Sequence, residues 1–330
     1  MIVSFATSLG MTPLARAIAL RIGVVDKPNQ RKIHQDHKPL MGGLAVVVAV
    51  SLSLLLFSTD SSLREILLIL LGVVLLAVTG LLDDRFDLSA KLRLGVQVLA
   101  ACILILAGIR IQLINFPLIN EIITIVWVVA LCNAVNFLDN MDGLSSGLTA
   151  IAATFFMLIG LTEGLPLVSM LAGALMGATL GFWIYNFNPS SIFIGDMGTL
   201  VMGYILATLG IKLEFGSQPL SITWMVPLFV LALPIFDIVL VVFTRISEGR
   251  SPGQAGKDHT SHRLMSLGLS QRKTTIILYL FCILNGVIAF FISTIPANNA
   301  LLLGMIGLAS LAVLFVVMIG LRKRYQLSTQ

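Results

Sequence analysis

Charged residues are scarce in this chain of 330 residues. Asp, Glu, Lys and Arg make up only 11% of it, whereas 57% of the residues are hydrophobic and the mean hydropathy is +1.00. A soluble domain carries about 25% charged residues, so this composition excludes a water-soluble globular protein. We expect an all-α, polytopic integral membrane protein.

Cysteine is scarce as well, and the pattern of a cleavable signal is lacking. The three cysteines lie in apolar stretches and form no CxxC pair, which argues against a metal site and fits small buried side chains. They are Cys102, Cys132 and Cys282. The first 20 residues have no basic region ahead of their apolar run, which Arg16 interrupts. We interpret them as a short first membrane helix.

Long apolar runs are abundant, and a bilayer needs about 20 such residues per helix. The sequence predicts about eleven spans, with the termini on opposite sides of the membrane. They cover residues 1–20, 41–58, 64–82, 92–110, 119–138, 144–161, 165–187, 198–215, 220–244, 274–294 and 299–321. No repeat, low-complexity sequence or long linker divides the chain, so residues 1–330 are predicted to form a single transmembrane domain.

Basic residues are distributed unequally between the two sides that these spans define. Seventeen of the 21 Lys and Arg residues fall on one side, and only Arg16, Arg64, Arg110 and Lys212 fall on the other. The positive-inside rule then places the N-terminus outside and the C-terminus in the cytoplasm. The net charge of +5 therefore reflects topology, and we expect no nucleic-acid partner.

The predicted cytoplasmic connections are longer than the outer ones and hold nearly all of the polar motifs. They cover residues 21–40, 83–91, 139–143, 188–197 and 245–273. Binding and catalytic residues concentrate on loops that a rigid scaffold positions. We therefore expect these five loops to form the functional face.

Two adjacent carboxylates, Asp83 and Asp84, end the third span, and Asp87 follows them. If the helix continues, Asp87 lies on nearly the same face. Such a cluster can hold Mg²⁺ through oxygen ligands or take a proton from a nucleophile. The alternative is a helix end that is simply solvated.

Four polar residues recur every three positions at the end of the fifth span: Asn133, Asn136, Asp139 and Asp142. The spacing predicts a polar stripe at a helix end, where Gly143 lets the backbone turn into the next span. The stripe favours a binding site. The alternative is hydrogen bonding between membrane helices.

Asp196 stands between Gly195 and Gly198, directly before the eighth span. The loop opens into a helix N-terminus, which favours anions, so a carboxylate there could hold a metal that is bound to a diphosphate. A simple N-cap is the alternative.

The longest predicted cytoplasmic loop carries a compact group of basic and histidine residues, with only Asp258 to offset it. The group is Lys257, His259, His262 and Arg263. It suits contact with phosphate or with charge in a transition state. An ordinary positive-inside loop is the alternative, and zinc binding is weakly supported because no cysteine is near.

A second basic loop contains Arg31, Lys32, His34 and Lys38 ahead of a Gly pair. Cytoplasmic anchoring charge is the alternative to a binding role here. In the ninth span, Asp237 is either a functional carboxylate or a structural partner of Arg245, two helical turns further on.

These five motifs together resemble the polyprenyl-phosphate N-acetylhexosamine-1-phosphate transferases, of the glycosyltransferase family 4 type. The resemblance runs from about Arg31 to Arg263. The family includes the initiating enzymes of enterobacterial antigen and teichoic acid, the MurNAc-pentapeptide translocase and a eukaryotic dolichol enzyme. All five motifs occur in the family's order and on one predicted side of the membrane.

The resemblance implies roles for individual residues. Asp83 and Asp84 match paired aspartates that activate the lipid phosphate, and His259 and His262 match the histidine-rich loop. These four residues are the catalytic candidates. Asp196, with Asp84 and Asp139, is implied to bind Mg²⁺, or Mn²⁺ in its place. The implied substrate contacts are Lys38, Asn133, Asn136, Asp139, Asp142, Phe193, Lys257 and Arg263.

The implied reaction is transfer of HexNAc-1-phosphate from a UDP-sugar to polyprenyl phosphate, with release of UMP. It would take place in one catalytic domain at the cytoplasmic face of a bacterial inner membrane, and a homodimer is among the expected forms. The MurNAc-pentapeptide branch has three consecutive histidines where this chain has Ser261-His262-Arg263, and its Thr-Pro-Thr-Met-Gly-Gly stretch appears here as Lys38-Pro39-Leu40-Met41-Gly42-Gly43. These departures favour UDP-GlcNAc as donor.

Two alternatives stay open on the sequence. One is the MurNAc-pentapeptide transferase itself. The other, from a different class, is a nucleotide-sugar transporter, although transporters usually place their sites near the middle of the bilayer. The carboxylates of this chain fall mostly at predicted helix ends instead.

Overall fold

The computed structural model describes residues 1–26, 38–59, 62–215, 219–251, 253 and 256–328. The predicted contacts of Arg31, Lys32 and His34 lie outside these residues. The chain forms two compact units, unit 1 (Met1–Glu214) and unit 2 (Phe215–Gln330). That the whole chain acts as one catalytic domain stays a prediction.

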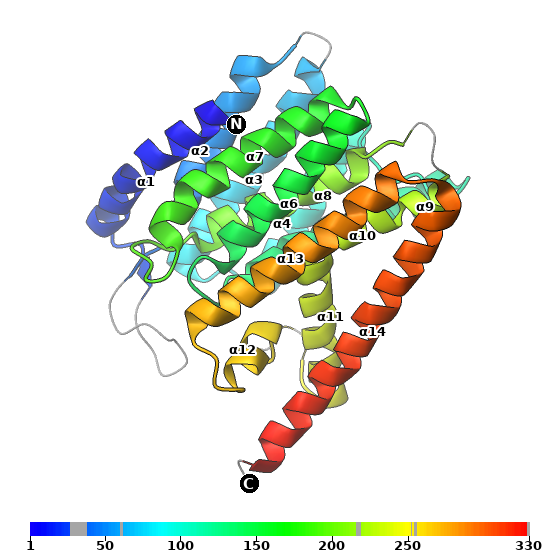
Figure 1. The fold of residues 1–330 in the computed structure, drawn as a ribbon. Helices are drawn as coiled ribbons and strands as arrows, with labels where there is room; N and C mark the ends of the chain where they lie inside the picture. Colours follow the sequence, from blue (N-terminus) through cyan, green and yellow to red (C-terminus); the bar gives the residue numbers. More distant parts are fainter. Residues whose placement is uncertain (27–37, 60–61, 216–218, 252, 254–255, 329–330) are drawn as a thin grey trace. The chain divides into compact units, whose positions relative to one another are not determined.

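In its described residues, unit 1 has eight helices and one pair of short strands (Figure 1). The helices are α1 (Ile2–Ile22), α2 (Gly42–Phe57), α3 (Leu63–Phe86), α4 (Ala90–Leu106), α5 (Pro117–Leu138), α6 (Leu144–Thr162), α7 (Pro166–Asn186) and α8 (Gly195–Lys212). The strands β1 (Val25–Asp26) and β2 (Lys38–Pro39) pair in antiparallel register.

Within its described residues, unit 2 contains helices joined by loops and no strand. Its helices are α9 (Leu220–Thr223), α10 (Met225–Val230), α11 (Ala232–Ser247), α12 (Thr260–Met265), α13 (Gln271–Thr294) and α14 (Ala297–Ser328). The prediction of an all-α, polytopic membrane protein is confirmed.

Each of the eleven predicted apolar runs falls on helical structure, but the number of spans is not confirmed. Within the described ranges, seven helices are long and apolar enough to cross a membrane, or eight if one bent pair of helices counts as a single span. The helix α2 is apolar but shorter.

The ninth run was predicted as one continuous span, and this is wrong. It is divided into α9, α10 and α11, with a bend of 80° between Leu220–Val230 and Ala232–Ser247. Two prolines explain the divisions. A proline ring clashes with the carbonyl group four residues earlier. Pro227 therefore ends α9 at Thr223, and Pro234 ends α10 at Val230.

The helix α8 forms the core of unit 1 and packs against α2, α3, α5, α6 and α7. Nearly all of its side chains are buried, as expected of a helix that is apolar on all sides. Glycines allow the closest approaches. A Cβ at Gly80 of α3 would meet the backbone of Met197, and one at Gly203 would meet the backbone of Cys132 in α5.

The helices α1 and α7 also pack through small residues. A Cβ at Gly177 would meet Met1 and Ser4, and one at Gly181 would meet Phe5 and Ser8. The glycine repeat of α7 is therefore a helix-packing surface, which is the role that such repeats have in membrane helices.

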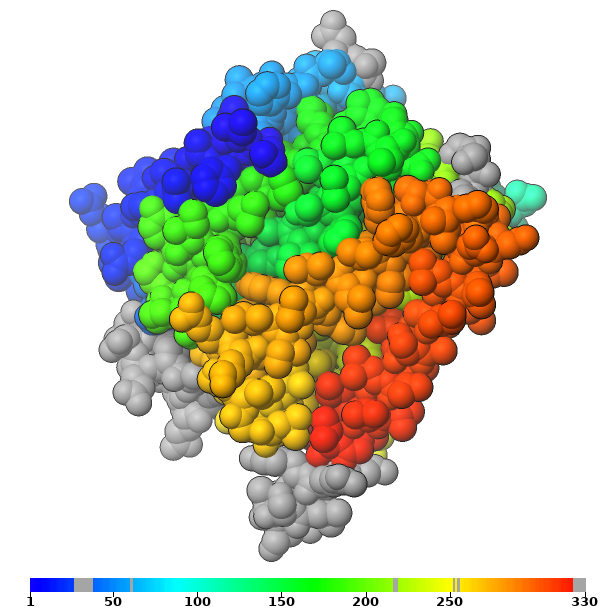
Figure 2. All heavy atoms as spheres, in the orientation of Figure 1, coloured from blue at the N-terminus to red at the C-terminus, as the bar shows by residue number. Residues whose placement is uncertain are grey.

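Unit 2 packs around the aromatic side chain of Phe236. Its ring lies 6.1 Å from that of Phe281 in α13 and 6.0 Å from that of Phe315 in α14, measured between centroids. The helix α14, orange to red in Figure 2, lies along the visible face of the molecule, and many of its exposed side chains are apolar, among them Leu302, Ile306 and Val316. Such a face suits contact with lipid.

Candidate active site

The paired aspartates lie at the C-terminal end of α3, and only one of them is neutralised by a neighbour. The Asp83 carboxylate is buried and accepts hydrogen bonds from Arg93 Nη1 (2.6 Å) and from the Leu88 backbone N–H (2.8 Å). The alternative of a solvated helix end is therefore wrong for Asp83. Its immediate partner is a cation from the first turn of α4.

Asp84 is held differently. Its Oδ1 accepts the backbone N–H of Asp196 at 3.0 Å. Its Oδ2 is buried, and among the described residues no hydrogen-bond donor contacts it. A buried carboxylate oxygen without a donor is costly in free energy, so it marks a position where a ligand or cation could bind.

Asp196 lies in the first turn of α8, but it is not the N-cap, because Ile194 occupies that position. Its Oδ1 accepts a hydrogen bond from Asn136 Nδ2 at 2.7 Å, and its Oδ2 lies 3.7 Å from Arg93 Nη1. Asn136 also donates to Thr199 Oγ1 at 2.9 Å. The ends of α3, α4, α5 and α8 thus bring Asp83, Asp84, Arg93, Asn136 and Asp196 together; we call these residues the acidic cluster.

Asp139 lies directly after α5, near the acidic cluster, where its charge acts on Asp84. Ser145 Oγ donates to Asp139 Oδ1 at 2.5 Å. Burial raises the pKa of Asp139 to about 7, and the charges of Asp142 and Asp26 add to the effect while the Ser145 hydrogen bond opposes it. A positive charge bound nearby would therefore favour the ionised form of Asp139 at neutral pH.

Asp142 supports the loop between α7 and α8. Its Oδ2 accepts hydrogen bonds from Asn188 Nδ2 and the Ser190 backbone N–H, and its Oδ1 accepts one from Ser190 Oγ, all at 3.0 Å. Lys38 Nζ in turn donates to the Ser190 carbonyl at 2.7 Å. Asp142 and Lys38, both predicted substrate contacts, therefore lie at the two ends of one hydrogen-bonded chain.

Phe193 lies in the same loop, held by its backbone. It donates to the Pro39 carbonyl and accepts from the Gly42 N–H, both at 2.9 Å, while Gly43 donates to Ile194 at 2.7 Å. The glycine pair Gly42-Gly43 allows a close approach between backbones, because a Cβ at Gly43 would meet the backbone of Gly198.

Asn133 is the member of the polar stripe that lies deepest in α5. Its Nδ2 donates to Gln97 Oε1 of α4 at 2.7 Å and to the Val129 carbonyl at 2.8 Å. Of the two sequence interpretations, hydrogen bonding between helices describes Asn133, whereas Asn136 belongs to the acidic cluster.

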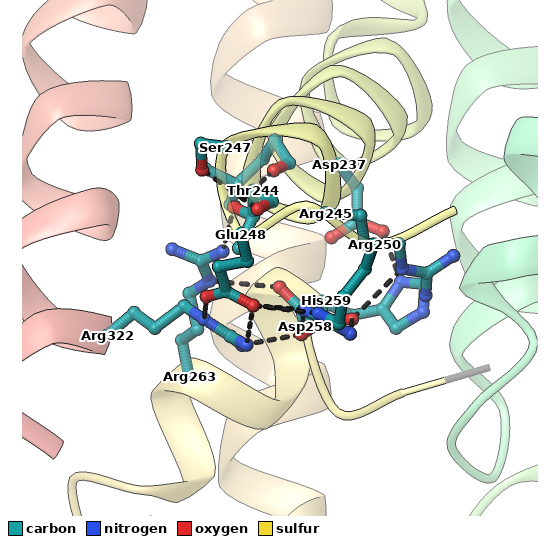
Figure 3. A network of polar contacts seen from close by, with 11 residues as sticks. Asp237, Thr244, Arg245, Ser247, Glu248, Arg250, Asp258, His259, Arg263 and Arg322 are labelled. Carbon is teal, nitrogen blue, oxygen red and sulfur yellow. Dashed lines mark hydrogen bonds and ion pairs between the residues drawn. The ribbon is translucent and has the colours of Figure 1, made fainter. Parts of the chain in front are cut away.

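In unit 2, the basic loop is organised around Asp258 (Figure 3). Its Oδ2 accepts from Arg245 Nε (3.0 Å), and its Oδ1 pairs with Arg250 Nη2 (2.8 Å) and Arg322 Nη1 (2.6 Å). Glu248 pairs with Arg250 and Arg322 as well. Burial alone would raise the pKa of Asp258, but these guanidinium groups hold that pKa well below its ordinary value.

Arg263 is buried and holds α12 in place. Its Nε donates to the Asp258 carbonyl (2.9 Å), its Nη1 to the Met318 carbonyl (2.6 Å) and its Nη2 to Thr244 Oγ1 (2.7 Å). Burial lowers the pKa of Arg263 to about 10, so it stays charged at neutral pH. Arg263 was predicted to contact substrate, but its guanidinium group forms hydrogen bonds within unit 2 instead.

The two histidines differ in surroundings. His259 Nδ1 lies 2.7 Å from Asp237 Oδ2, whereas Arg245 pairs with Asp258, so the suggested pairing of Asp237 with Arg245 is replaced by one with His259. Burial, with the charges of His259 and Lys257, lowers the pKa of His262 to about 4. His262 is therefore neutral at pH 7. The sequence had suggested that it belongs to a cationic group, and the lowered pKa argues against this. Lys257 is exposed.

Comparison with known proteins decides the family. The chain is 33% identical over 327 residues to a Bacillus subtilis protein named "Probable undecaprenyl-phosphate N-acetylglucosaminyl 1-phosphate transferase", covering 96% of this chain and 88% of the relative. A model of glycosyl transferase family 4 matches residues 66–214. The chain belongs to glycosyl transferase family 4. It is therefore a membrane-embedded transferase, as the motifs predicted.

Other members of family 4 are similar over most of their length. A decaprenyl-phosphate N-acetylglucosaminephosphotransferase of Mycolicibacterium smegmatis is 30% identical, covering 95% of this chain and 86% of the relative. An undecaprenyl-phosphate alpha-N-acetylglucosaminyl 1-phosphate transferase of Salmonella typhimurium is 30% identical, covering 81% of this chain and 76% of the relative.

The family 4 resemblance implies a divalent metal, and the acidic cluster has suitable donors for one. Among the described residues, no three Asp, Glu, His or Cys side chains form a ready-made set of ligands. Magnesium, however, is usually bound by one or two carboxylates together with substrate phosphates. The undonated Asp84 Oδ2 and the neighbouring Asp196 carboxylate fit that pattern.

Arg93 is the residue of this family 4 site that the sequence motifs missed. It entered the sequence argument only as one of many cytoplasmic cations. Arg93 lies ten positions after Asp83. Helical periodicity does not predict their contact, because α3 ends and α4 begins between them. Only the turn at residues 87–89 brings the two side chains together.

Proposed function

We propose that this family 4 protein transfers GlcNAc-1-phosphate from UDP-GlcNAc to a polyprenyl phosphate such as undecaprenyl phosphate. The products are polyprenyl-diphosphate-GlcNAc and UMP. The observation that carries this proposal is the near full-length similarity to relatives named for this transfer, in a chain whose buried Asp84 Oδ2 has no donor among the described residues.

The chemistry is phosphoryl transfer between two anions. An oxygen of polyprenyl phosphate attacks the β-phosphorus of UDP-GlcNAc, the bond to the α-phosphate oxygen breaks, and UMP departs with that oxygen. Catalysis of this kind depends on positioning and charge stabilisation more than on covalent intermediates.

Named residues supply these functions. Arg93, fixed by Asp83, offers a guanidinium beside the Asp196 carboxylate and can contact phosphate oxygens. Asp84 and Asp196, with Asp139 nearby, would hold Mg²⁺ or Mn²⁺. When bound, the ion supplies positive charge that offsets the donor diphosphate.

The remaining predicted residues keep distinct proposed roles. Asp142, Lys38 and Phe193 shape the 188–194 loop for the nucleotide. Asp142 accepts from the Ser190 N–H, Lys38 donates to the Ser190 carbonyl, and the Phe193 N–H donates to the Pro39 carbonyl. His259 would stabilise charge that develops as UMP leaves, with His262 as a neutral neighbour.

A reconstituted assay tests the function. Purified protein in detergent is supplied with radiolabelled UDP-GlcNAc, undecaprenyl phosphate and Mg²⁺, and both UMP and organic-extractable label are measured. We expect equal amounts of the two products, and no turnover of UDP-MurNAc-pentapeptide. Use of the pentapeptide donor instead would assign the alternative branch, and uptake of intact UDP-GlcNAc by sealed vesicles without lipid product would indicate a transporter.

We also propose the membrane orientation: N-terminus outside, C-terminus and acidic cluster cytoplasmic, in a bacterial inner membrane. The distribution of Lys and Arg supports it. Single cysteines would be introduced as Ser62→Cys and Ser270→Cys in a cysteine-free background. An impermeant maleimide should label Ser62→Cys in intact cells and Ser270→Cys only after permeabilisation; the reverse pattern would invert the topology.

A further inference from the structure

The carboxylate of Asp237 is completely buried in α11, yet both of its oxygens have partners in the neighbouring helix α12. Its Oδ2 lies 2.7 Å from His259 Nδ1, and its Oδ1 accepts the Thr260 backbone N–H at 2.7 Å. A buried carboxylate is costly unless it is paired and hydrogen-bonded. Both conditions are met here by one pair of adjacent residues.

This arrangement fixes the imidazole in two ways. One carboxylate oxygen bonds to the ring itself, and the other bonds to the backbone immediately after it. His259 is the N-cap of α12, and the first N–H groups of a helix have no partner within it. Because Asp237 supplies that partner from another helix, the ring cannot turn away without breaking its bond to a carboxylate that the backbone also holds.

The contact also determines which ring nitrogen carries a proton. An ionised carboxylate only accepts hydrogen bonds, so Nδ1 must be the donor to Asp237. The proton on Nδ1 makes Nε2 the nitrogen through which His259 would act.

The residue on the other side of His259 is fixed as well. Asp258 pairs with Arg245, Arg250 and Arg322, so His259 stands between two anchored neighbours. Catalytic side chains need such support to stay in a productive orientation. In Figure 3, Asp237 and His259 lie at one side of this network, with the arginines grouped around Asp258.

We propose that Asp237 is a positioning residue for His259, which it holds with Nδ1 protonated and Nε2 presented for the reaction. This inference rests on the proposed function, in which His259 stabilises charge on the transferring phosphate. Asp237 thus differs in role from Arg245, Arg250 and Arg322. Asp237 contacts the His259 ring, whereas these arginines pair with Asp258 and stabilise unit 2.

A double-mutant cycle tests the proposal, with turnover of UDP-GlcNAc into labelled lipid as the readout. Asp237→Asn should lower kcat by about 10- to 100-fold, the range for lost partners of functional histidines, with KM for UDP-GlcNAc changed less than about 3-fold. In a His259→Ala background, the same substitution should change kcat by less than about 3-fold, because residues that act through one another are not additive.

Thr244→Val provides the matched control. It removes a buried hydrogen bond to Arg263 in the same unit and should lower the melting temperature. Its effect on kcat should be the same with and without His259. Asp237→Glu keeps the carboxylate and should retain more kcat than Asp237→Asn; if Asp237→Asn does not fold, the cycle is run with Asp237→Glu.

The outcomes are separable from those for the function itself. If wild-type protein forms no labelled lipid, the proposed function is refuted, and this inference falls with it. If wild-type protein is active, the inference is overturned by equal losses from Asp237→Asn in both backgrounds, by wild-type kcat in the folded Asp237 variant, or by wild-type kcat in His259→Ala.

Discussion

The acidic cluster of unit 1 and the arginine network of unit 2 use the same kinds of residue in opposite proportions. In the cluster, Asp83 and Asp196 both lie near Nη1 of Arg93, and Asp84 Oδ2 has no donor among the described residues. In the network, Asp258 alone pairs with three arginines. Among the described residues, the carboxylates of the cluster outnumber its cations, whereas the network is neutralised by its own side chains.

We propose that this difference separates residues that take part in the reaction from residues that stabilise the fold. Charges that are compensated within the protein lower the energy of the folded state and leave little capacity for a ligand. Carboxylates left without compensation destabilise the fold and are retained where a substrate or cation supplies the missing charge. Both regions contain sequence motifs of the same family, so motif membership alone does not distinguish the two roles.

The largest expected effect is on turnover, from removing one carboxylate of the acidic cluster. Asp84→Asn or Asp196→Asn should lower kcat by about 10²–10⁴-fold, the range for a lost acid–base or charge-stabilising group. The melting temperature should stay equal or rise, because repulsion between carboxylates is relieved. Asp87→Asn is the control, since Asp87 is exposed and its left-handed backbone conformation also suits Asn. A large loss of stability in Asp84→Asn or Asp196→Asn would show that the substituted carboxylate stabilises the fold, as Asp258 does.

The next effect is on stability, from the centre of the arginine network. Asp258→Asn removes the anion that three guanidinium groups share and leaves the buried Arg245 without the carboxylate it pairs with. Breaking a buried ion pair costs about 3–5 kcal/mol. We expect a lower melting temperature in detergent, measured by intrinsic fluorescence. If the variant melts like wild type, the network contributes nothing and the comparison fails.

The pH dependence of this effect follows from the lowered pKa of Asp258. A carboxyl group with a lowered folded-state pKa stabilises the protein above its ordinary value of about 3.9 and loses that contribution as pH falls through the folded value. The stability difference between wild type and Asp258→Asn should therefore be constant from about pH 5 to 8 and shrink only below about pH 4. A difference that disappears near pH 6 would contradict this assignment.

Arg263→Ala should also lower the stability of unit 2. Hydrogen bonds to charged groups contribute about 1.5–3 kcal/mol each, and Arg263 donates to three protein acceptors. We expect reduced stability with KM for UDP-GlcNAc within about 2-fold of wild type. A large increase in KM at unchanged melting temperature would restore the role in substrate binding that the sequence suggested.

The smallest effect is expected at Asn133. Its hydrogen bond to Gln97 joins two membrane helices, and such bonds contribute about 0.6 kcal/mol on average. Asn133→Ala should leave kcat close to wild type, whereas Asn136→Ala, which removes a donor to Asp196, should lower it clearly. Equal losses of kcat in the two variants would extend the site to the whole polar stripe.

The helices and the cluster of acidic motifs were predictable from sequence because both are local signals. Apolar length identifies a membrane helix without knowledge of its neighbours, and each of the eleven predicted runs is helical. The breaks at Pro227 and Pro234 were also encoded locally, but the length of the apolar run masked them. Asp84, Asp196 and Asn136 come together because each lies at the end of its own helix.

The pairing of charges could not be predicted, because it depends on contacts between distant parts of the chain. Only Asp258 was predicted to offset the charge of the basic loop. In the structure, Asp237 pairs with His259 and Glu248 pairs with Arg322, and Arg322 of α14 joins the network from far along the chain. Arg93 escaped notice for the same reason, since no motif relates it to Asp196.

The most direct test of the central claim is divalent cation binding to purified protein, measured by the loss of the free Mn²⁺ resonance signal in the presence of UDP-GlcNAc. The account predicts that wild type, Asp87→Asn and folded Asp258→Asn each bind one ion, and that Asp84→Asn and Asp196→Asn bind it much more weakly. Undiminished binding by both cluster variants, or its loss in folded Asp258→Asn, would contradict the claim that the uncompensated carboxylates of unit 1 form the reactive centre.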